Sequence, residues 1–188
     1  TVQRLFNRID GEVKNALRPY GLYEPPVTYD YRADGKDWQI SIQIVPGEPV
    51  RVRELAITIE GPGSADPAFD AIRAQTIIRN GMRLHHGAYE QVKGELTRAA
   101  AANGYLAARL HDEPPRLVVD AQAHSARIAL TLDTGPRYNF GHIDIEQNII
   151  RPELMNRFLR FREGDPYNAT ELLRTQFALD DSLYFSSV

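Results

Sequence analysis

Side chains that could bind a metal or carry out catalysis are few in this sequence, and their spacing suits neither purpose. His85 and His86 are the best candidates for metal ligands, but adjacent residues of an extended segment point to opposite sides and no third ligand follows at a helical spacing. We expect this pair in a surface loop. The aspartates at 30, 34 and 37 lack the alternating ligands and closing glutamate of a calcium loop. The sequence predicts no metal site and no cofactor.

Motifs for nucleophilic or phosphate chemistry are also missing from the sequence. It contains no cysteine, which excludes disulfides, thiolate metal ligands and cysteine nucleophiles. It has no Gly-x-Ser-x-Gly elbow, no P-loop and no Gly-x-Gly-x-x-Gly run. We therefore predict no catalytic residues and a protein that is not an enzyme.

Composition and charge describe an ordinary globular chain. Of the 188 residues 43% are hydrophobic and 25% charged, and 22 basic against 25 acidic side chains give a net charge of −3. This balance argues against a nucleic-acid-binding protein, which would normally carry a basic stripe. No run reaches the roughly 18 apolar residues of a membrane-spanning helix.

The elements that would position any site are set by an internal repeat. Two segments that alternate apolar and polar residues, as half-buried strands do, match each other at an offset of 88. The first copy has Ile40, Ile42, Ile44, Gly47, Val50, Val52, Leu55, Ile57 and Ile59, and the second has Ile128, Leu130, Leu132, Gly135, Tyr138, Phe140, Ile143, Ile145 and Gln147. The helical sequence between them recurs at an offset of 83, as Gly81 and Gly164 illustrate.

Capping signals delimit the expected helices. Asp66 and Pro67 predict a helix start, and Asn80-Gly81 predict a left-handed stop. A second helix is expected from about 88 to 103, closed by Gly104, with a counterpart from about 168 to 177. Another helix is expected from about 4 to 20, with its apolar residues on one face.

Hairpins and short tags complete the pattern. We expect residues 27–31 to pair with 38–42 around Asp34-Gly35, and residues 116–123 to pair with 126–133. A glycine-aromatic tag follows each long helix, at 21–23 and 104–106, so that the chain can reverse. Its third copy, 183–185, has Leu183 in place of glycine, and a left-handed backbone there would cost about 1 kcal/mol.

Three modules of the order strand, helix, helix, strand, strand result. We expect residues 1–46 to form a partial first module with the second helix and hairpin, 47–134 a complete second module, and 135–188 a truncated third module. Against this pattern, the first and third modules are each incomplete.

These modules and several motifs resemble POTRA (polypeptide-transport-associated) domains of TamA-like outer-membrane assembly factors, in the BamA/TamA superfamily. The resemblance covers nearly the whole chain and is most specific at residues 137–141 (RYNFG) and 163–167 (EGDPY). It implies an α+β fold of tandem POTRA modules, in which two helices cover one face of a small mixed three-stranded sheet. It also implies the periplasmic region of a Gram-negative outer-membrane protein that helps to insert or translocate β-barrel and autotransporter proteins.

The resemblance further implies partners and a binding site. The partners would be unfolded outer-membrane protein substrates, a TamB-like protein anchored in the inner membrane, and the protein's own C-terminal β-barrel, which lies outside this sequence. The first strand of the second module's hairpin is expected at a sheet edge, where its free backbone groups could accept an extended chain. The low net charge would suit a site that does not discriminate by charge. The strand comprises Leu117, Val118, Val119, Asp120 and Ala121.

Alternatives remain open at this point. The chain could be the POTRA region of another assembly protein or of a two-partner secretion transporter, and module count and barrel sequence would separate these. A division protein with one POTRA module fits the tandem repeat less well. A repeated α+β enzyme would need a cluster of perturbed titratable groups in a pocket, and the sequence offers none.

Overall fold

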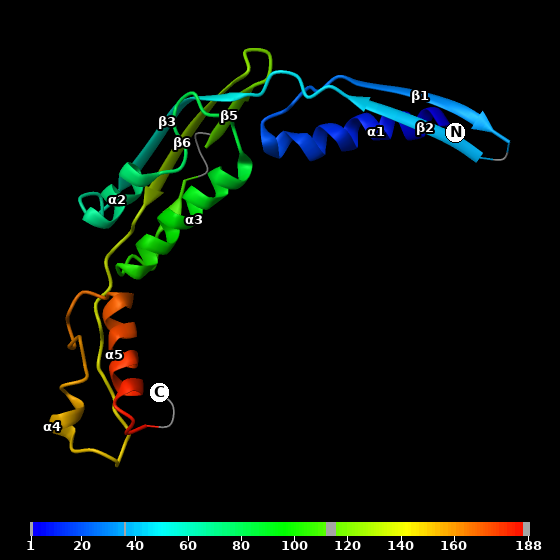
Figure 1. Ribbon diagram of the computed structural model, residues 1–188. Coiled ribbons are helices and arrows are strands. Elements are labelled where there is room, and N and C mark those ends of the chain that lie inside the picture. Colours follow the sequence, from blue (N-terminus) through cyan, green and yellow to red (C-terminus); the bar gives the residue numbers. More distant parts are fainter. Residues whose placement is uncertain (1, 36, 112–115, 186–188) are drawn as a thin grey trace. The chain divides into compact units, whose positions relative to one another are not determined.

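The structure is a computed structural model, and it describes residues 2–35, 37–111 and 116–185. Figure 1 shows the order of the helices and strands along the chain. The helices are α1 (Val2–Leu17), the 3₁₀ turn η1 (Arg18–Tyr20), α2 (Pro67–Gln75), α3 (His86–Ala102), α4 (Pro152–Met155) and α5 (Ala169–Asp181). The strands are β1 (Val27–Asp34), β2 (Asp37–Ile44), β3 (Arg51–Glu60), β4 (Arg109–Leu110), β5 (Leu117–Asp120) and β6 (Ser125–Asp133).

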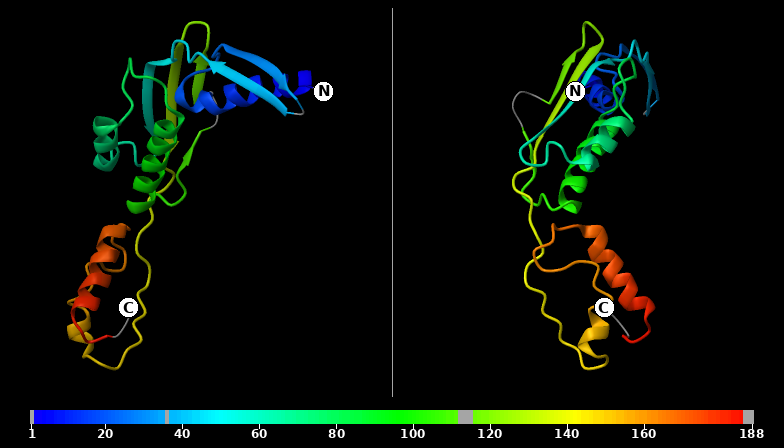
Figure 2. Two further views of the ribbon diagram at one scale, coloured as in Figure 1. Left: turned by 45° about the vertical axis from the view of Figure 1, so that its right-hand side comes forward. Right: turned by 90° about the vertical axis from the view of Figure 1, so that its left-hand side faces the viewer.

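Two sheets are present in the described part of the chain. Strands β1 and β2 form an antiparallel hairpin that lies alongside α1, and Gly35 at its tip has the positive φ of 65° that its turn requires (Figures 1 and 2). The second sheet has the order β3-β6-β4, with β5 also paired to β6. Because β4 and β5 both pair with β6, the four strands occupy three positions side by side, which gives the small mixed sheet expected of the α+β fold.

The pairing of β3 with β6 is parallel and contains one irregularity. Arg51 donates its N–H to the His124 carbonyl at one end, and Thr134 donates its N–H to the Glu60 carbonyl at the other. The first bond sets residue 51 beside 125 and the second sets residue 60 beside 133. The offset changes by one, so β3 holds one extra residue, as a β-bulge does.

One face of this sheet is buried beneath helices. Alternate residues of β6 are buried, and the right-hand view of Figure 2 shows α2 and α3 on the same side of the strands. Asp66 caps α2 by accepting the Ala68 N–H at 3.0 Å, as predicted. The helix nevertheless ends at Gln75 and not near Asn80, because the Thr76 hydroxyl accepts the Ile78 N–H and competes with the helical bond.

The chain divides into two compact units. The first comprises Thr1–Ile57, Thr76–Val92 and Asp112–Leu130, and the second comprises Thr58–Gln75, Lys93–His111 and Thr131–Val188. The first unit buries Leu22, Val50, Val52, Ile78, Leu84, Tyr89, Val92, Ala126, Ile128 and Leu130. The second buries Ile59, Phe69, Leu96, Ala100, Tyr105, Leu132, Thr134, Met155, Thr175 and Leu179.

Residues 138–147 differ from the expectation. They match β3 in the repeat, but the structure gives them a single bridge, between Asn139 and Pro166, and no strand. Their apolar pattern therefore lacks a neighbouring strand in the described part of the chain. The helical side chains of the same module are correspondingly open, since Leu172 and Phe177 are exposed and Leu154 and Phe158 are only half-buried.

Candidate docking strand and the joints between modules

Strand β5 holds four of the five residues predicted for the edge strand. Leu117 lies opposite Ile128 and Asp120 opposite Ser125, while Ala121 begins the turn that follows. Within the part of the chain that the structure describes, β5 pairs with β6 alone. Its other side therefore faces no strand.

The direction of the β5 backbone groups follows from the register. In an antiparallel ladder, residue pairs that exchange two hydrogen bonds alternate with pairs that exchange none. Ala129 donates its N–H to the Arg116 carbonyl at 2.9 Å, so residue 116 belongs to a bonded pair, as does Val118 two residues later. Leu117 and Val119 belong to the other pairs. Their N–H and C=O groups therefore point away from β6, toward the open side.

Other bonds of β6 obey the same alternation. His111 donates its N–H to the Thr131 carbonyl, and Thr134 donates its N–H to the Glu60 carbonyl of β3. Odd-numbered residues of β6 thus direct their backbone groups toward β4 and β5, and even-numbered positions direct theirs toward β3. The outward direction of Leu117 and Val119 is consistent with every printed bond of this strand.

A hollow of about 630 Å³ lies beside β5 on the sheet face opposite the helices. Its lining combines an exposed valine with four charged side chains. The lining residues are Glu24, Arg53, Val118, Val119, Asp120, Ala121, Gln122, Ser125 and Arg127. An extended chain added to β5 would place alternate side chains next to this hollow.

The glycine tags form joints between successive modules. At the first joint, Gly21 accepts the Val50 N–H on its carbonyl at 2.8 Å, and the Val50 carbonyl accepts the Leu84 N–H at 2.8 Å. At the second joint, Gly104 accepts the Tyr138 N–H at 2.8 Å, and the Tyr138 carbonyl accepts the Tyr167 N–H at 2.9 Å. These residues are related by the offsets of 88 and 83, so the repeat extends to the hydrogen bonds.

Glycine is required at both joints for two reasons. Gly21 and Gly104 have φ of 76° and 88°, a region that side chains disfavour. A Cβ on Gly21 would also lie 2.6 Å from the Leu84 carbonyl oxygen, and one on Gly104 would lie 3.0 Å from the carbonyl oxygens of Tyr138 and Tyr167. The third tag keeps the same backbone, with Leu183 at φ 59° and almost fully exposed.

At the first joint, side chains contact His85 and His86, the two histidines that the sequence offered as metal ligands. The Tyr23 hydroxyl lies 2.7 Å from His86 Nε2, and the Tyr20 and His85 rings meet edge to face at 5.4 Å between centroids. Burial lowers the pKa of His86 below its usual 6.5, with a further contribution from the neighbouring His85, while Glu90 opposes the shift. The expectation of a plain surface loop for this pair is therefore wrong for His86, which is half-buried in a joint.

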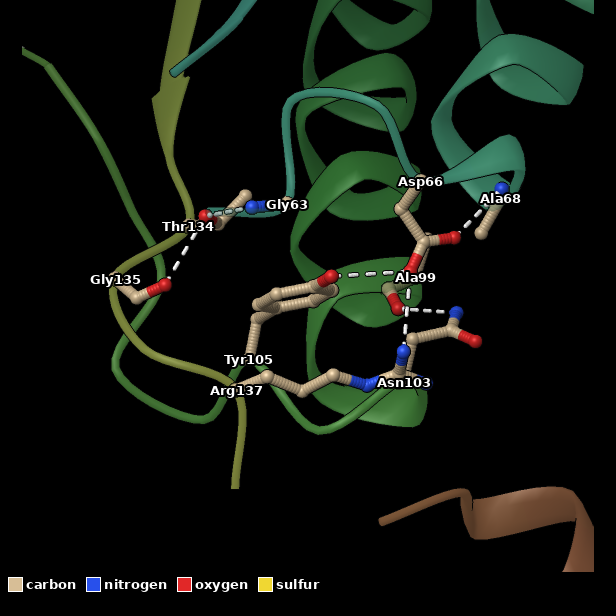
Figure 3. Close-up of polar contacts among 9 residues, drawn as sticks. All are labelled: Gly63, Asp66, Ala68, Ala99, Asn103, Tyr105, Thr134, Gly135 and Arg137. Carbon is tan, nitrogen blue, oxygen red and sulfur yellow. Dashed lines mark hydrogen bonds and ion pairs between the residues drawn. The ribbon is translucent and has the colours of Figure 1, made fainter. Parts of the chain in front are cut away.

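The second joint is held by a different polar cluster (Figure 3). The Tyr105 hydroxyl donates to Asp66 Oδ2 at 3.1 Å, and Arg137 lies 4.0 Å from the same oxygen and over the Tyr105 ring. Burial and the Asp66 carboxylate raise the pKa of Tyr105. Nearby, the buried Thr134 hydroxyl accepts the Gly63 N–H at 3.0 Å. Asp66 thus links the start of α2 to the tag that follows α3.

Comparison with known proteins accounts for this arrangement. Residues 1–46 match the family model described as POTRA domain TamA domain 1. POTRA domains 3–5 of BamA from Haemophilus influenzae share the fold, with a TM-score of 0.52 and 16% identity over 97% of this chain and 71% of that one. Residues 1–46 therefore match a POTRA family, and the chain as a whole has the fold of tandem POTRA domains. At 16% identity, the likeness to BamA shows only that the two proteins share a fold.

Two further solved structures match with lower TM-scores. POTRA domains 1–3 of Omp85 from Anabaena match with 16% identity, a TM-score of 0.35, and coverage of 92% of this chain and 69% of that one. The N-terminal domain of Omp85 from Thermosynechococcus elongatus matches with 15% identity, a TM-score of 0.37, and coverage of 92% and 70%.

Sequence reasoning did not predict the backbone hydrogen bonds at the two joints. The tags at Gly21 and Gly104 were expected to let the chain reverse, and in the structure their carbonyls also accept the N–H groups of Val50 and Tyr138. The signal was present, because residues 50 and 138 share one offset and residues 84 and 167 share the other. No helix in the described part of the chain is long and apolar enough to span a membrane.

Proposed function

We propose that this chain is the periplasmic POTRA region of a TamA-like outer-membrane protein, and that β5 docks extended strands of substrate and partner proteins. The region would act as a scaffold without catalysis of its own. Its protein would help to insert or translocate β-barrel and autotransporter proteins. The match of residues 1–46 to the first POTRA domain of TamA supports the TamA-like assignment.

The observation that carries the docking role is the open backbone of β5. Leu117 and Val119 direct two N–H and two C=O groups to a side that no described strand covers. Free strand edges pair readily with other extended chains through these groups. Because such pairing uses the backbone, one edge can accept strands of many sequences, which suits a receptor for diverse unfolded barrel proteins.

The proposed occupants are extended segments of two sources. The first is a strand of an unfolded outer-membrane protein on its way to the membrane. The second is a strand of a TamB-like partner anchored in the inner membrane. The protein's own C-terminal β-barrel would be the destination of the first. Each occupant would add one strand beside β5 and would need no change within β6.

Two substitutions at one residue test the docking role. Val119→Pro removes an outward N–H without removing a bond to β6, because proline is tolerated on the free side of an edge strand. Val119→Ala also removes the valine side chain but keeps the N–H. We expect an extended peptide from an outer-membrane barrel strand to bind the alanine variant as it binds the unaltered chain, and to bind the proline variant at least tenfold more weakly.

Fluorescence anisotropy of the labelled peptide measures both affinities, and urea unfolding shows whether each variant is folded. Val118→Pro serves as the opposite control, because it removes an N–H that points to β6 and should lower the stability of the module. Equal peptide affinities for Val119→Pro and Val119→Ala, in variants of equal stability, would contradict docking at β5.

A further inference from the structure

The hollow beside β5 contains a row of side chains that crosses three strands. Val118 lies opposite Arg127 in the register of β5 and β6. On the other side of β6, the pairing at that end sets Arg53 beside Arg127. These three side chains lie on the exposed face, because the β6 residues next to Arg127 in sequence are buried beneath the helices. The row thus runs from β3 to the open edge.

Both guanidinium groups of this row lack a partner. Among the residues that the structure describes, neither Arg53 nor Arg127 makes a side-chain hydrogen bond or an ion pair. Glu24 and Asp120 also line the hollow, but neither is paired with these arginines, and Asp120 accepts the Ala123 N–H at its own turn. Two arginines therefore face the hollow with their donors free.

We propose that β5 and its hollow select extended chains that carry a carboxylate side chain at the level of Val118. This inference rests on the proposed docking role of β5. An added strand would place one side chain next to Val118 on the exposed face, and Arg127 and Arg53 follow behind it in the same row. The preferred occupant is an acidic strand segment of an unfolded protein.

The chemistry of the two groups accounts for this choice. Arginine presents a planar fork of donors that matches a carboxylate. At strand spacings of about 4.8 Å, Arg127 lies two strands from the added residue and can reach its side chain, whereas Arg53 lies three strands away and adds to the positive charge of the row. A lysine at the same level would be repelled by both. Because the site is open to water, the preference should be moderate and should fall as salt screens the charges. The sequence analysis expected a site that does not discriminate by charge, and under this proposal only the backbone pairing is independent of charge.

Three peptides that differ at one position test the selection. Each is an alternating Thr-Val strand of about ten residues, a typical strand length, with Glu, Gln or Lys at its centre. We expect the Glu peptide to bind about five- to tenfold more tightly than the Lys peptide at low salt, with Gln between them, and the difference to shrink at high salt. The double variant Arg53→Gln/Arg127→Gln should bind the Glu and Lys peptides equally.

Arg98→Gln is the matched control, because Arg98 is an exposed arginine of α3 outside the hollow. It should leave the preference for Glu unchanged. Equal binding of the Glu and Lys peptides to the unaltered chain would overturn the selection while leaving docking at β5 intact. If none of the three peptides bound, the docking role itself would fail and the selection with it.

Discussion

Gly21 shows how a single residue can carry the connection between two modules. Its carbonyl receives the Val50 N–H, and its bare Cα lets the Leu84 carbonyl approach. The same chain reversal at Leu183 shows that the backbone shape alone tolerates a side chain at a cost of order 1 kcal/mol. What glycine adds at Gly21 is room for a neighbouring backbone.

Two glycine variants separate these effects. Gly21→Ala should lower the free energy of unfolding by about 2–4 kcal/mol, because it combines an unfavourable φ with a contact at 2.6 Å. Gly81→Ala should cost only about 1 kcal/mol, because Gly81 has a φ of 86° but nothing within 4 Å of an added Cβ. Urea unfolding monitors both. Equal losses would show that the joint imposes no steric need for glycine.

His86 gives the first joint a dependence on pH. Burial lowers its pKa in the folded chain below the usual 6.5. Between the two values the unfolded chain binds more protons, so stability is full above about pH 6.5 and declines as pH falls toward the folded pKa. Protonation also places a charge beside His85 and against the Tyr23 hydroxyl.

A titration of the imidazole tests this prediction. The His86 midpoint, followed by NMR, should lie below 6.5 and should rise toward it when Gly21→Ala loosens the joint. His86→Gln should flatten the fall in stability below about pH 6.5. His124→Asn is the control, since His124 is exposed at φ 45°, which asparagine accepts. A His86 midpoint at or above 6.5 would contradict burial in the joint.

At the scale of the elements, the sequence correctly predicted features that depend on neighbouring residues, such as helix caps and tight turns. Asp66 caps α2 and Asp34-Gly35 closes the first hairpin, as predicted. Asn168, which was expected only as a helix start, also caps α5 by accepting the Thr170 N–H. The strand expected at residues 117–121 is present as β5 over 117–120, and its docking role stays a prediction.

What sequence reasoning could not supply depends on contacts across the fold. The extra residue in β3 lets Val52 and Ile59 both be buried although seven positions separate them, and no turn residue marks it. Residues 138–147 carry a strand pattern, yet a ladder needs a second strand. The direction of the Val119 N–H depends on the register with β6, which the apolar pattern does not encode.

Hydrogen exchange can test that register directly. The amides of Val118 and Asp120 should exchange slowly, because they point to β6, and those of Leu117 and Val119 should exchange quickly. The contrast should be at least tenfold at neutral pH and should need no ligand. Addition of a peptide strand should then slow Leu117 and Val119 alone. Slow exchange at Val119 in the free chain would mean that the register is shifted by one residue.

For the whole molecule, the repeat gives each joint the same backbone bonds but different side chains. Tyr23 and His86 meet at the first joint, and Tyr105, Asp66 and Arg137 at the second. A chain of this kind can keep its connections while each module offers a different surface. Among these surfaces, β5 combines an open backbone edge with a charged hollow.

The central claim is that β5 receives extended chains, and crosslinking in cells tests it most directly. A photoreactive residue at Val119, in the protein as it is naturally made, should form adducts with unfolded outer-membrane proteins or with a TamB-like partner. The same residue at Arg98, on the exposed side of α3, should form few. Adducts at Arg98 without adducts at Val119 would mean that this chain recognises its partners through helices, and would contradict docking at β5.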